Sequence, residues 1–207
     1  MIRDPQDIEA RSMQIIRSEL KVPLPDEVMP IVMRVIHATA DFSFAESMYF
    51  SPNAVRIMRD MLSRGATIIT DTNMALAGIN KMAAARLGAE LLCEMADEDV
   101  ARAARDKGVT RASVCAARAL EREGKRLLVC GNAPTFLLSI VEALKGKAHD
   151  DIAVIGVPVG FVNVVESKEA LRASGLTCIA SMGRRGGSNV AAAIVNALMY
   201  GIGGVRE

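Results

Sequence analysis

The sequence is poor in histidine and in aromatic side chains. His37 and His149 are the only two histidines among 207 residues, and Phe, Tyr and Trp together make up 3% of the chain, with no Trp. So few aromatic rings leave few platforms on which nucleic-acid bases could stack. The formal net charge of +1 also gives no overall positive field for nucleic acid or for an anionic membrane surface. We therefore expect no nucleic-acid partner and no membrane partner.

Paired cysteines and long apolar runs are missing as well. The four cysteines are widely spaced, and no Cys-x-x-Cys pair is present to hold zinc or to exchange disulfides. They are Cys93, Cys115, Cys130 and Cys178. Lys or Arg interrupts every apolar segment before it reaches the length of a membrane span, and the N-terminus lacks the apolar region of a signal peptide. We expect a cytoplasmic protein with four reduced, buried thiols.

Short apolar runs alternate with segments of helical periodicity along most of the chain. Apolar residues make up 51% and charged residues 24%, a balance typical of a globular protein. Strands are predicted at 66–70, 90–93, 127–130, 152–155 and 177–180. Runs that are apolar throughout and alternate with helices favour a parallel sheet covered on both faces. We expect one α/β domain over residues 1–207: a mostly parallel, doubly wound sheet of about five strands, flanked by helices.

Helical periodicity dominates the first third of the chain, which predicts a helical N-terminal section before the sheet. Ser51, Pro52 and Asn53 indicate a helix start in which Ser51 is the cap, and Gly65 indicates the end of that helix. Helices are predicted at 8–20, 26–37, 52–64, 98–107, 111–123, 134–145, 168–174 and 189–200.

Polar loops follow the predicted strands. Five of them are rich in Gly, Asn, Thr, Ser and basic residues: 70–73, 131–135, 156–160, 166–168 and 183–188. In open parallel sheets, ligands bind beyond the carboxyl ends of the strands, where such loops converge. The sequence therefore predicts a binding site at that edge of the sheet.

The glycine-rich segment 183–188 is the most suggestive of these loops. Its glycines permit close backbone approach, and backbone N–H groups at the start of the following helix attract anions. Arg184 and Arg185 add charged donors. Together with Lys168 and Arg111, this segment suggests a site for an anion that carries several carboxylates or phosphates. The alternative is a solvated turn with two surface arginines.

His37 is the main candidate for proton transfer, because histidine changes charge near neutral pH without being perturbed first. It lies near the end of an apolar helical segment, so the alternative is an ordinary packing residue. His149 is expected in an exposed loop with no second histidine nearby, and we expect no metal site. Neither dinucleotide- or nucleotide-binding glycine motifs nor the Gly-x-Ser-x-Gly motif of hydrolases is present. An isomerase or a binding protein fits these features better than a hydrolase or a dehydrogenase.

Seven segments, in this order along the chain, resemble the precorrin-8X methylmutase family, and most closely its cobalt-precorrin-8 branch from anaerobic cobalamin synthesis. They are RVIHATADF (34–42), TDTNMALAGINK (70–81), TR (110–111), GNAPT (131–135), GVPVGFV (156–162), ESKE (166–169) and GRRGGSNVAAAIVNAL (183–198). The resemblance extends from residue 8 to residue 200. Phe136 and the segments 112–114 and 163–165 depart from the common pattern, which leaves open whether the substrate contains cobalt or is metal-free.

The resemblance implies a reaction and a set of site residues. The reaction is a 1,5-migration of a methyl group from C-11 to C-12 of ring C of a tetrapyrrole, which gives cobyrinate or hydrogenobyrinate and needs no external cofactor. His37 is implied as the catalytic proton donor or acceptor, and Ser12 and Arg111 as substrate contacts. Further substrate-binding candidates are Asp71, Thr72, Lys168, Arg184 and Arg185. The family is usually dimeric, so we expect a homodimer in which the partner contributes to each pocket.

Two other functions stay open on the sequence. A non-catalytic corrinoid carrier that binds the product would need the same pocket but no proton transfer. A sugar-phosphate or nucleotide isomerase would be supported only by the anion-binding loops.

Overall fold

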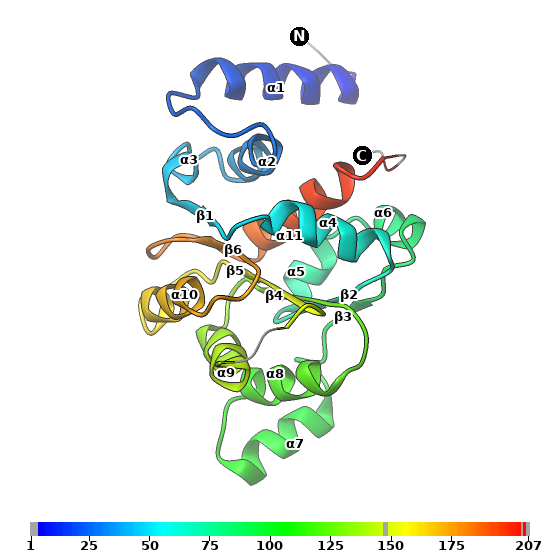
Figure 1. Ribbon diagram of the computed structural model, residues 1–207, viewed down its shortest axis with the longest axis vertical. Coiled ribbons are helices and arrows are strands. Elements are labelled where there is room, and N and C mark those ends of the chain that lie inside the picture. Colours follow the sequence, from blue (N-terminus) through cyan, green and yellow to red (C-terminus); the bar gives the residue numbers. More distant parts are fainter. Residues whose placement is uncertain (1–3, 147–148, 204, 206–207) are drawn as a thin grey trace.

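The computed structural model describes residues 4–146, 149–203 and 205 (Figure 1). Its centre is a six-stranded sheet in the order β1-β6-β5-β4-β2-β3. The strands are β1 (Met48–Phe50), β2 (Thr67–Thr70), β3 (Leu91–Leu92), β4 (Arg126–Cys130), β5 (Ile152–Gly156) and β6 (Cys178–Ser181). All neighbouring pairs are parallel except β1 with β6, which is antiparallel. The prediction of a mostly parallel sheet flanked by helices is confirmed, with one more strand than expected.

Eleven helices surround this sheet in the described part of the chain. Those before β2 are α1 (Pro5–Glu19), α2 (Met29–Thr39), α3 (Phe44–Ser47) and α4 (Ala54–Ser63). Those between β2 and β4 are α5 (Asn73–Gly78), α6 (Lys81–Arg86), α7 (Glu98–Lys107) and α8 (Arg111–Glu121). The last three are α9 (Pro134–Leu144), α10 (Val164–Ala173) and α11 (Ser188–Tyr200). None of the helices in these residues is long and apolar enough to cross a membrane.

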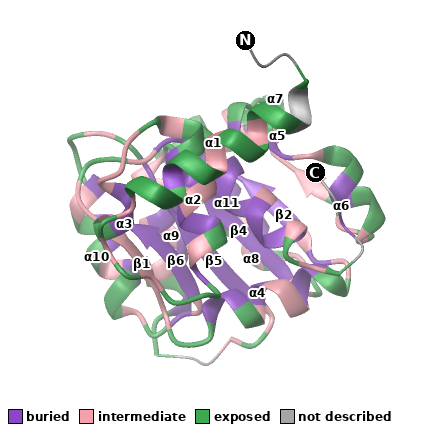
Figure 2. Cartoon of the chain, turned by 90° about the horizontal axis from the view of Figure 1, so that it is seen from above, coloured by how far each residue is buried: buried purple, intermediate pink, exposed green. Residues whose placement is uncertain are grey.

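The alternation of side chains along the central strands divides the apolar interior into two layers. Leu127 and Val129 of β4 point into the layer formed with α2, α4 and α11, whereas Leu128 and Cys130 point into the layer formed with α8 and α9. Figure 1 shows α7, α8 and α9 on one side of the sheet and α2, α4 and α11 on the other. Every residue of β4 and β5 is buried, so these central strands are covered on both faces, and Figure 2 colours them as buried.

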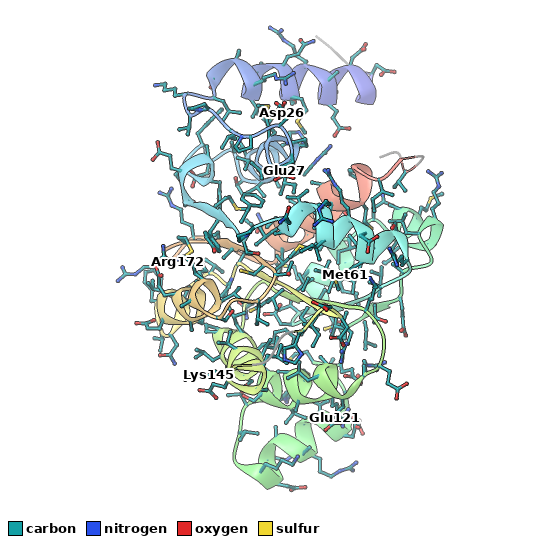
Figure 3. All side chains as sticks on the ribbon, viewed as in Figure 1. Asp26, Glu27, Met61, Glu121, Lys145 and Arg172 are labelled. Carbon is teal, nitrogen blue, oxygen red and sulfur yellow. The ribbon has the colours of Figure 1, made fainter. Side chains whose placement is uncertain are left out.

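The N-terminal section is helical, as predicted, and packs on the rest of the chain through α2. Four apolar residues of α2, Ile31, Val32, Val35 and Ile36, are at most 1% exposed. They join the layer that contains α11 and Met61 of α4, which is labelled in Figure 3. Helix α1 contacts α2 and lies on its far side from the sheet (Figure 1). The helix that ends in His37 and Thr39 is therefore held firmly against the core.

Two local predictions were wrong, and four short elements were missed. Helix α10 begins at Val164, four residues before the predicted start, because Asn163 takes a left-handed conformation (φ 59°) immediately before it. Ser51 does not cap α4: its hydroxyl accepts a hydrogen bond from the N–H of Cys178 in the neighbouring strand, and Asn53 is the residue before the helix. Strand β1 and the short helices α3, α5 and α6 were not predicted.

Candidate active site

Four loops meet at the carboxyl edge of the parallel strands, following β2, β4, β5 and β6. The loops after β5 and β6 are hydrogen-bonded to each other: the N–H of Gly187 donates to the carbonyl of Val157 (2.8 Å), and the N–H of Gly160 donates to the carbonyl of Arg184 (3.1 Å). The N–H of Val157 also donates to the carbonyl of Cys130 (2.8 Å) at the end of β4. The fifth predicted loop, 166–168, is not a strand-end loop, since it lies within α10. The edge is thus one connected layer of backbone rather than a set of independent turns.

Asp71, directly after β2, organises the loop after β4. Its side chain is fully buried, and its carboxylate accepts hydrogen bonds from the N–H groups of Gly131 (2.8 Å), Asn132 (2.8 Å) and Ala133 (2.6 Å). A buried carboxylate is tolerated only when such donors replace its hydration. Burial and the neighbouring carboxylate of Asp71 raise the pKa of the Cys130 thiol well above its usual range, so this cysteine is not a nucleophile. Asp71 therefore holds the loop from beneath and has no exposed surface for a substrate.

Thr72 joins the starts of two helices. Its hydroxyl accepts the N–H of Ala75 (3.1 Å) as the cap of α5, and it shares a hydrogen bond with the hydroxyl of Ser188 (2.8 Å) at the start of α11. The side chain of Thr72 is half-buried. Thr72 therefore lies at the edge of the sheet where the sequence predicts a binding site, next to Asp71.

Lys168 is fully buried, although it was predicted from the sequence to contact an anionic substrate. Its ammonium donates to the backbone carbonyls of Gly183 (2.9 Å) and Arg185 (2.7 Å). Burial lowers the pKa of this lysine from 10.5 to about 8. The two carbonyls belong to the glycine-rich loop after β6, so Lys168 supports that loop from inside.

Arg184 and Arg185 project from the glycine-rich loop, and both are exposed. The guanidinium of Arg184 lies 5.5 Å from the centre of the Phe161 ring in the loop after β5. The guanidinium of Arg185 forms an ion pair with Asp41 (3.0 Å) and donates to the hydroxyl of Ser43. Hydrogen bonds from Ser43, and then the charge of Arg185, hold the pKa of Asp41 below its usual value.

His37 lies in the last turn of α2 and is exposed. The helix ends at Ala40, which has a left-handed conformation (φ 53°), and Asp41 follows directly. Because Asp41 is paired with Arg185, the end of the His37 helix is attached to the glycine-rich loop. The imidazole is therefore accessible to a ligand and belongs to the same corner of the molecule as the two arginines.

Arg111 and Ser12 occupy different surroundings. Arg111 is exposed in the first turn of α8, and the preceding Thr110 donates to the hydroxyl of Thr135 (3.1 Å), which places Arg111 beside the loop after β4. Ser12 lies on α1, where its hydroxyl donates to the carbonyl of Ile8 (2.8 Å) in the same helix. The structure therefore gathers Asp71, Thr72, Arg111, Lys168, Arg184 and Arg185 at or beneath one edge, with Ser12 on the helix that covers α2.

Exposed apolar side chains also lie on these loops, and they were not singled out from the sequence. The loop after β5 exposes 82% of Phe161 and 77% of Val162, and the start of α5 exposes 73% of Met74. The sequence could have indicated them, because they are apolar residues in otherwise polar loops, and an exposed apolar surface often marks a binding site. An edge with exposed guanidinium groups and apolar side chains suits a ligand with an apolar body and anionic substituents. Within the described residues, no group of three or more His, Cys, Asp and Glu side chains is arranged to hold a metal ion.

Comparison with known proteins places the chain in a family. The family model described as precorrin-8X methylmutase matches residues 7–201. A cobalt-precorrin-8 methylmutase from Salmonella typhimurium is 45% identical, with 96% of each chain covered. A precorrin-8X methylmutase from Pseudomonas aeruginosa is 37% identical, with 95% of this chain and 96% of that protein covered. The crystal structure of a precorrin-8X methylmutase from Thermus thermophilus superposes with a TM-score of 0.83 at 36% identity, covering 93% of this chain and 95% of that one. Sequence and fold agree, and the chain belongs to the precorrin-8X methylmutase family.

Proposed function

We propose that this protein is a cytoplasmic isomerase of cobalamin biosynthesis that moves the methyl group of precorrin-8 or cobalt-precorrin-8 from C-11 to C-12 of ring C. The observation that carries the proposal is the attachment of the His37 helix to the glycine-rich loop through Arg185 and Asp41. This arrangement supplies one accessible proton-transfer group beside exposed cations. Relatives named for this reaction, matched over nearly the whole chain, support the same assignment.

For this reaction the protein has mainly to hold the substrate in position. In the isomerisation the C-11–methyl bond breaks and the C-12–methyl bond forms, with no gain or loss of atoms and no change in overall oxidation state. The ring system must be held in one geometry and one tautomer, with a proton at the correct position. We assign proton donation or acceptance to the imidazole of His37, a contribution of about 10²- to 10⁴-fold for a positioned acid or base.

The remaining candidates serve binding. The acetate and propionate groups of the substrate are partners for the exposed guanidinium groups of Arg111, Arg184 and Arg185. The exposed side chains of Phe161 and Met74 are available to its apolar faces. The mechanism uses no external cofactor and no metal bound by the protein, and any cobalt belongs to the substrate.

Substitution of His37 tests the proposal. Wild-type protein incubated with precorrin-8X, or with its cobalt form, should shift the absorption spectrum to that of the corrin product. His37→Ala should lose conversion by about 10²-fold or more while still binding the product, because the binding groups are intact. His149→Gln is the matched control and should convert at the wild-type rate.

Two other outcomes would contradict the proposal. Wild-type protein that is folded but converts neither substrate would exclude the methylmutase activity. Conversion by His37→Ala at the wild-type rate would contradict the role assigned to His37, whereas wild-type protein that binds the product without converting substrate would favour a corrinoid carrier.

We further propose that the protein is a homodimer and that Ser12 completes the pocket of the partner subunit. Ile8, Ser12 and Ile15 follow one another at helical spacing along α1, and Ile8 and Ile15 are 47% and 41% exposed. An apolar stripe beside a predicted substrate contact is typical of a helix that packs against a second copy.

Mixing two inactive variants tests this arrangement. In an equimolar mixture of Ser12→Ala and His37→Ala, half of the dimers are mixed, and each mixed dimer has one intact pocket of two. About a quarter of wild-type activity should therefore return after subunit exchange. No recovery in a mixture that sedimentation shows to be dimeric would place Ser12 and His37 in the same pocket of one chain.

A further inference from the structure

The buried ammonium of Lys168 is an unusual feature of the site. The side chain has no exposed surface, and its nitrogen donates to two backbone carbonyls, those of Gly183 (2.9 Å) and Arg185 (2.7 Å). Lysine is rarely buried, since removing its charge from water is costly. An apolar side chain of similar length could fill the same space in α10 without that cost, so packing alone does not account for a lysine at this position.

The two carbonyls that Lys168 binds flank Arg184 in the sequence. Fixing the backbone on both sides of a residue also fixes the direction in which its side chain leaves the chain. The Arg185 carbonyl accepts a second hydrogen bond from the hydroxyl of Ser181 (2.9 Å) at the end of β6. The backbone of the two exposed arginines is therefore attached to two buried groups, one on α10 and one on the sheet.

The same backbone determines where the side chain of Arg185 can reach. That side chain pairs with Asp41 (3.0 Å) and donates to Ser43, immediately after the helix of His37. A continuous set of contacts thus runs from the Lys168 ammonium through the backbone and side chain of Arg185 to the segment that follows His37. Lys168 itself is enclosed beneath the loop and offers no surface to a ligand.

We propose that Lys168 is a positioning residue: its ammonium holds the 183–185 backbone and thereby sets Arg184, Arg185 and the end of the His37 helix relative to one another, without touching the substrate. The inference rests on the proposed function for its catalytic consequence. It replaces the sequence-based prediction that Lys168 binds the substrate directly. The lowered pKa of Lys168, about 8, still leaves the ammonium mostly charged at neutral pH.

Hydrogen exchange of the substrate-free protein tests the structural half of this proposal. Lys168→Met keeps the length of the side chain and removes its donors. Backbone amides in 182–187 should then exchange at least about tenfold faster, while the amides of β4 and β5 are unchanged. Lys145→Met, an exposed lysine at the end of α9 labelled in Figure 3, is the matched control and should leave exchange unaltered. Wild-type exchange rates in 182–187 of Lys168→Met would overturn the proposal.

Kinetics with the tetrapyrrole substrate test the catalytic half. Lys168→Met should lower kcat/KM by about 10- to 100-fold, with a loss in kcat, because misplacement of reacting groups by about 1 Å can cost that much. In an Arg185→Ala background the same change should cost less than about threefold, since Lys168 acts largely through Arg185. If the effects of Lys168→Met and Arg185→Ala on kcat/KM are fully additive, and Lys168→Met raises KM without lowering kcat, Lys168 binds the substrate directly instead.

A second variant keeps the test decisive if Lys168→Met does not fold. Lys168→Gln retains an N–H donor on a shorter side chain, and its exchange rates and kcat should lie between those of wild type and a protein without the donor. Rates equal to wild type in both measurements would overturn the proposal. If the exchange result holds but wild-type protein converts no tetrapyrrole, the positioning role stands and the proposed function fails.

Discussion

Replacing Asp71 by Asn tests how much one buried carboxylate contributes to the site. The substitution conserves size and removes the charge. In the wild type, Oδ1 accepts the N–H of Gly131, and Oδ2 accepts the N–H groups of Asn132 and Ala133. An amide has only one acceptor oxygen, so in every orientation its NH₂ group faces at least one backbone donor. The least costly orientation keeps the bonds to Asn132 and Ala133 and leaves the N–H of Gly131 without an acceptor.

The cost follows from these bonds. Two charge-assisted hydrogen bonds become neutral ones, at a loss of about 0.5–1 kcal/mol each, and the unsatisfied N–H of Gly131 adds about 1–3 kcal/mol. The free energy of unfolding should therefore fall by about 3 kcal/mol. For a protein of this length, each kcal/mol corresponds to roughly 2–4 °C, so the Tm should fall by about 6–12 °C. The change also reaches α11, because Gly131 packs so closely on Ser188 that an added Cβ would lie 2.8 Å from its Cα.

Thermal unfolding followed by circular dichroism or calorimetry measures the effect. Asp97→Asn is the matched control, because Asp97 is exposed and its side chain makes no capping hydrogen bond to α7. That control should change stability by no more than about 0.5 kcal/mol. A Tm of Asp71→Asn equal to that of Asp97→Asn would refute the reasoning that the carboxylate holds the loop.

Three further predictions concern the glycine-rich loop and its supports. Gly186→Ala should lower both Tm and kcat/KM, because a Cβ there would overlap the carbonyl oxygen of Val157; wild-type values for the folded variant would contradict this. Since burial lowers the pKa of Lys168 from 10.5 to about 8, the unfolded chain binds more protons between these values and stability should rise with pH in that window. Melting at pH 7–10.5 should show a smaller rise for Lys168→Met than for wild type, and equal slopes would contradict the assignment. Arg185→Gln should raise the pKa of Asp41 measured by carboxyl NMR, and an unchanged value would argue against the ion pair.

The central strands were predictable from the sequence because they are apolar throughout. The predicted strands 127–130 and 152–155 differ by one residue from β4 and β5. Strand β1 has only three residues, all half-buried, and it exists because Met48–Phe50 pairs with residues 179–181 at the other end of the chain. No local pattern encodes that pairing, so it could be found only in three dimensions.

The convergence of the polar loops at one edge of the sheet was predictable, but the structural roles of their buried charged residues were not. Parallel strands end at the same edge, so loops after them had to converge. Asp71 was taken for a substrate contact from the family resemblance alone, and Lys168 from that resemblance and as a cation near the anion-binding loop, but charged side chains are rarely buried and both of these are. Asp71 can be buried because it accepts hydrogen bonds from backbone N–H groups 60 to 62 residues further along the chain. Lys168 can be buried because it donates to backbone carbonyls 15 and 17 residues further along. The sequence also did not indicate that Arg185 would reach Asp41, 144 residues away.

The pairing of β1 with β6 affects the order in which parts of the protein can fold during synthesis. The hydroxyl of Ser51 accepts the N–H of Cys178, 127 residues later, so closing this contact costs roughly 4 kcal/mol of chain entropy before any other gain. Helix α2 packs mainly against α11, the last helix of the chain. When synthesis has reached the end of β5, α2 with His37 has therefore already been made, but β6 and α11, against which the N-terminal section packs, have not. The region where the end of α2 meets the glycine-rich loop is among the last parts to assemble, and a chain shortened before residue 178 would retain His37 without the loop to which its helix is attached.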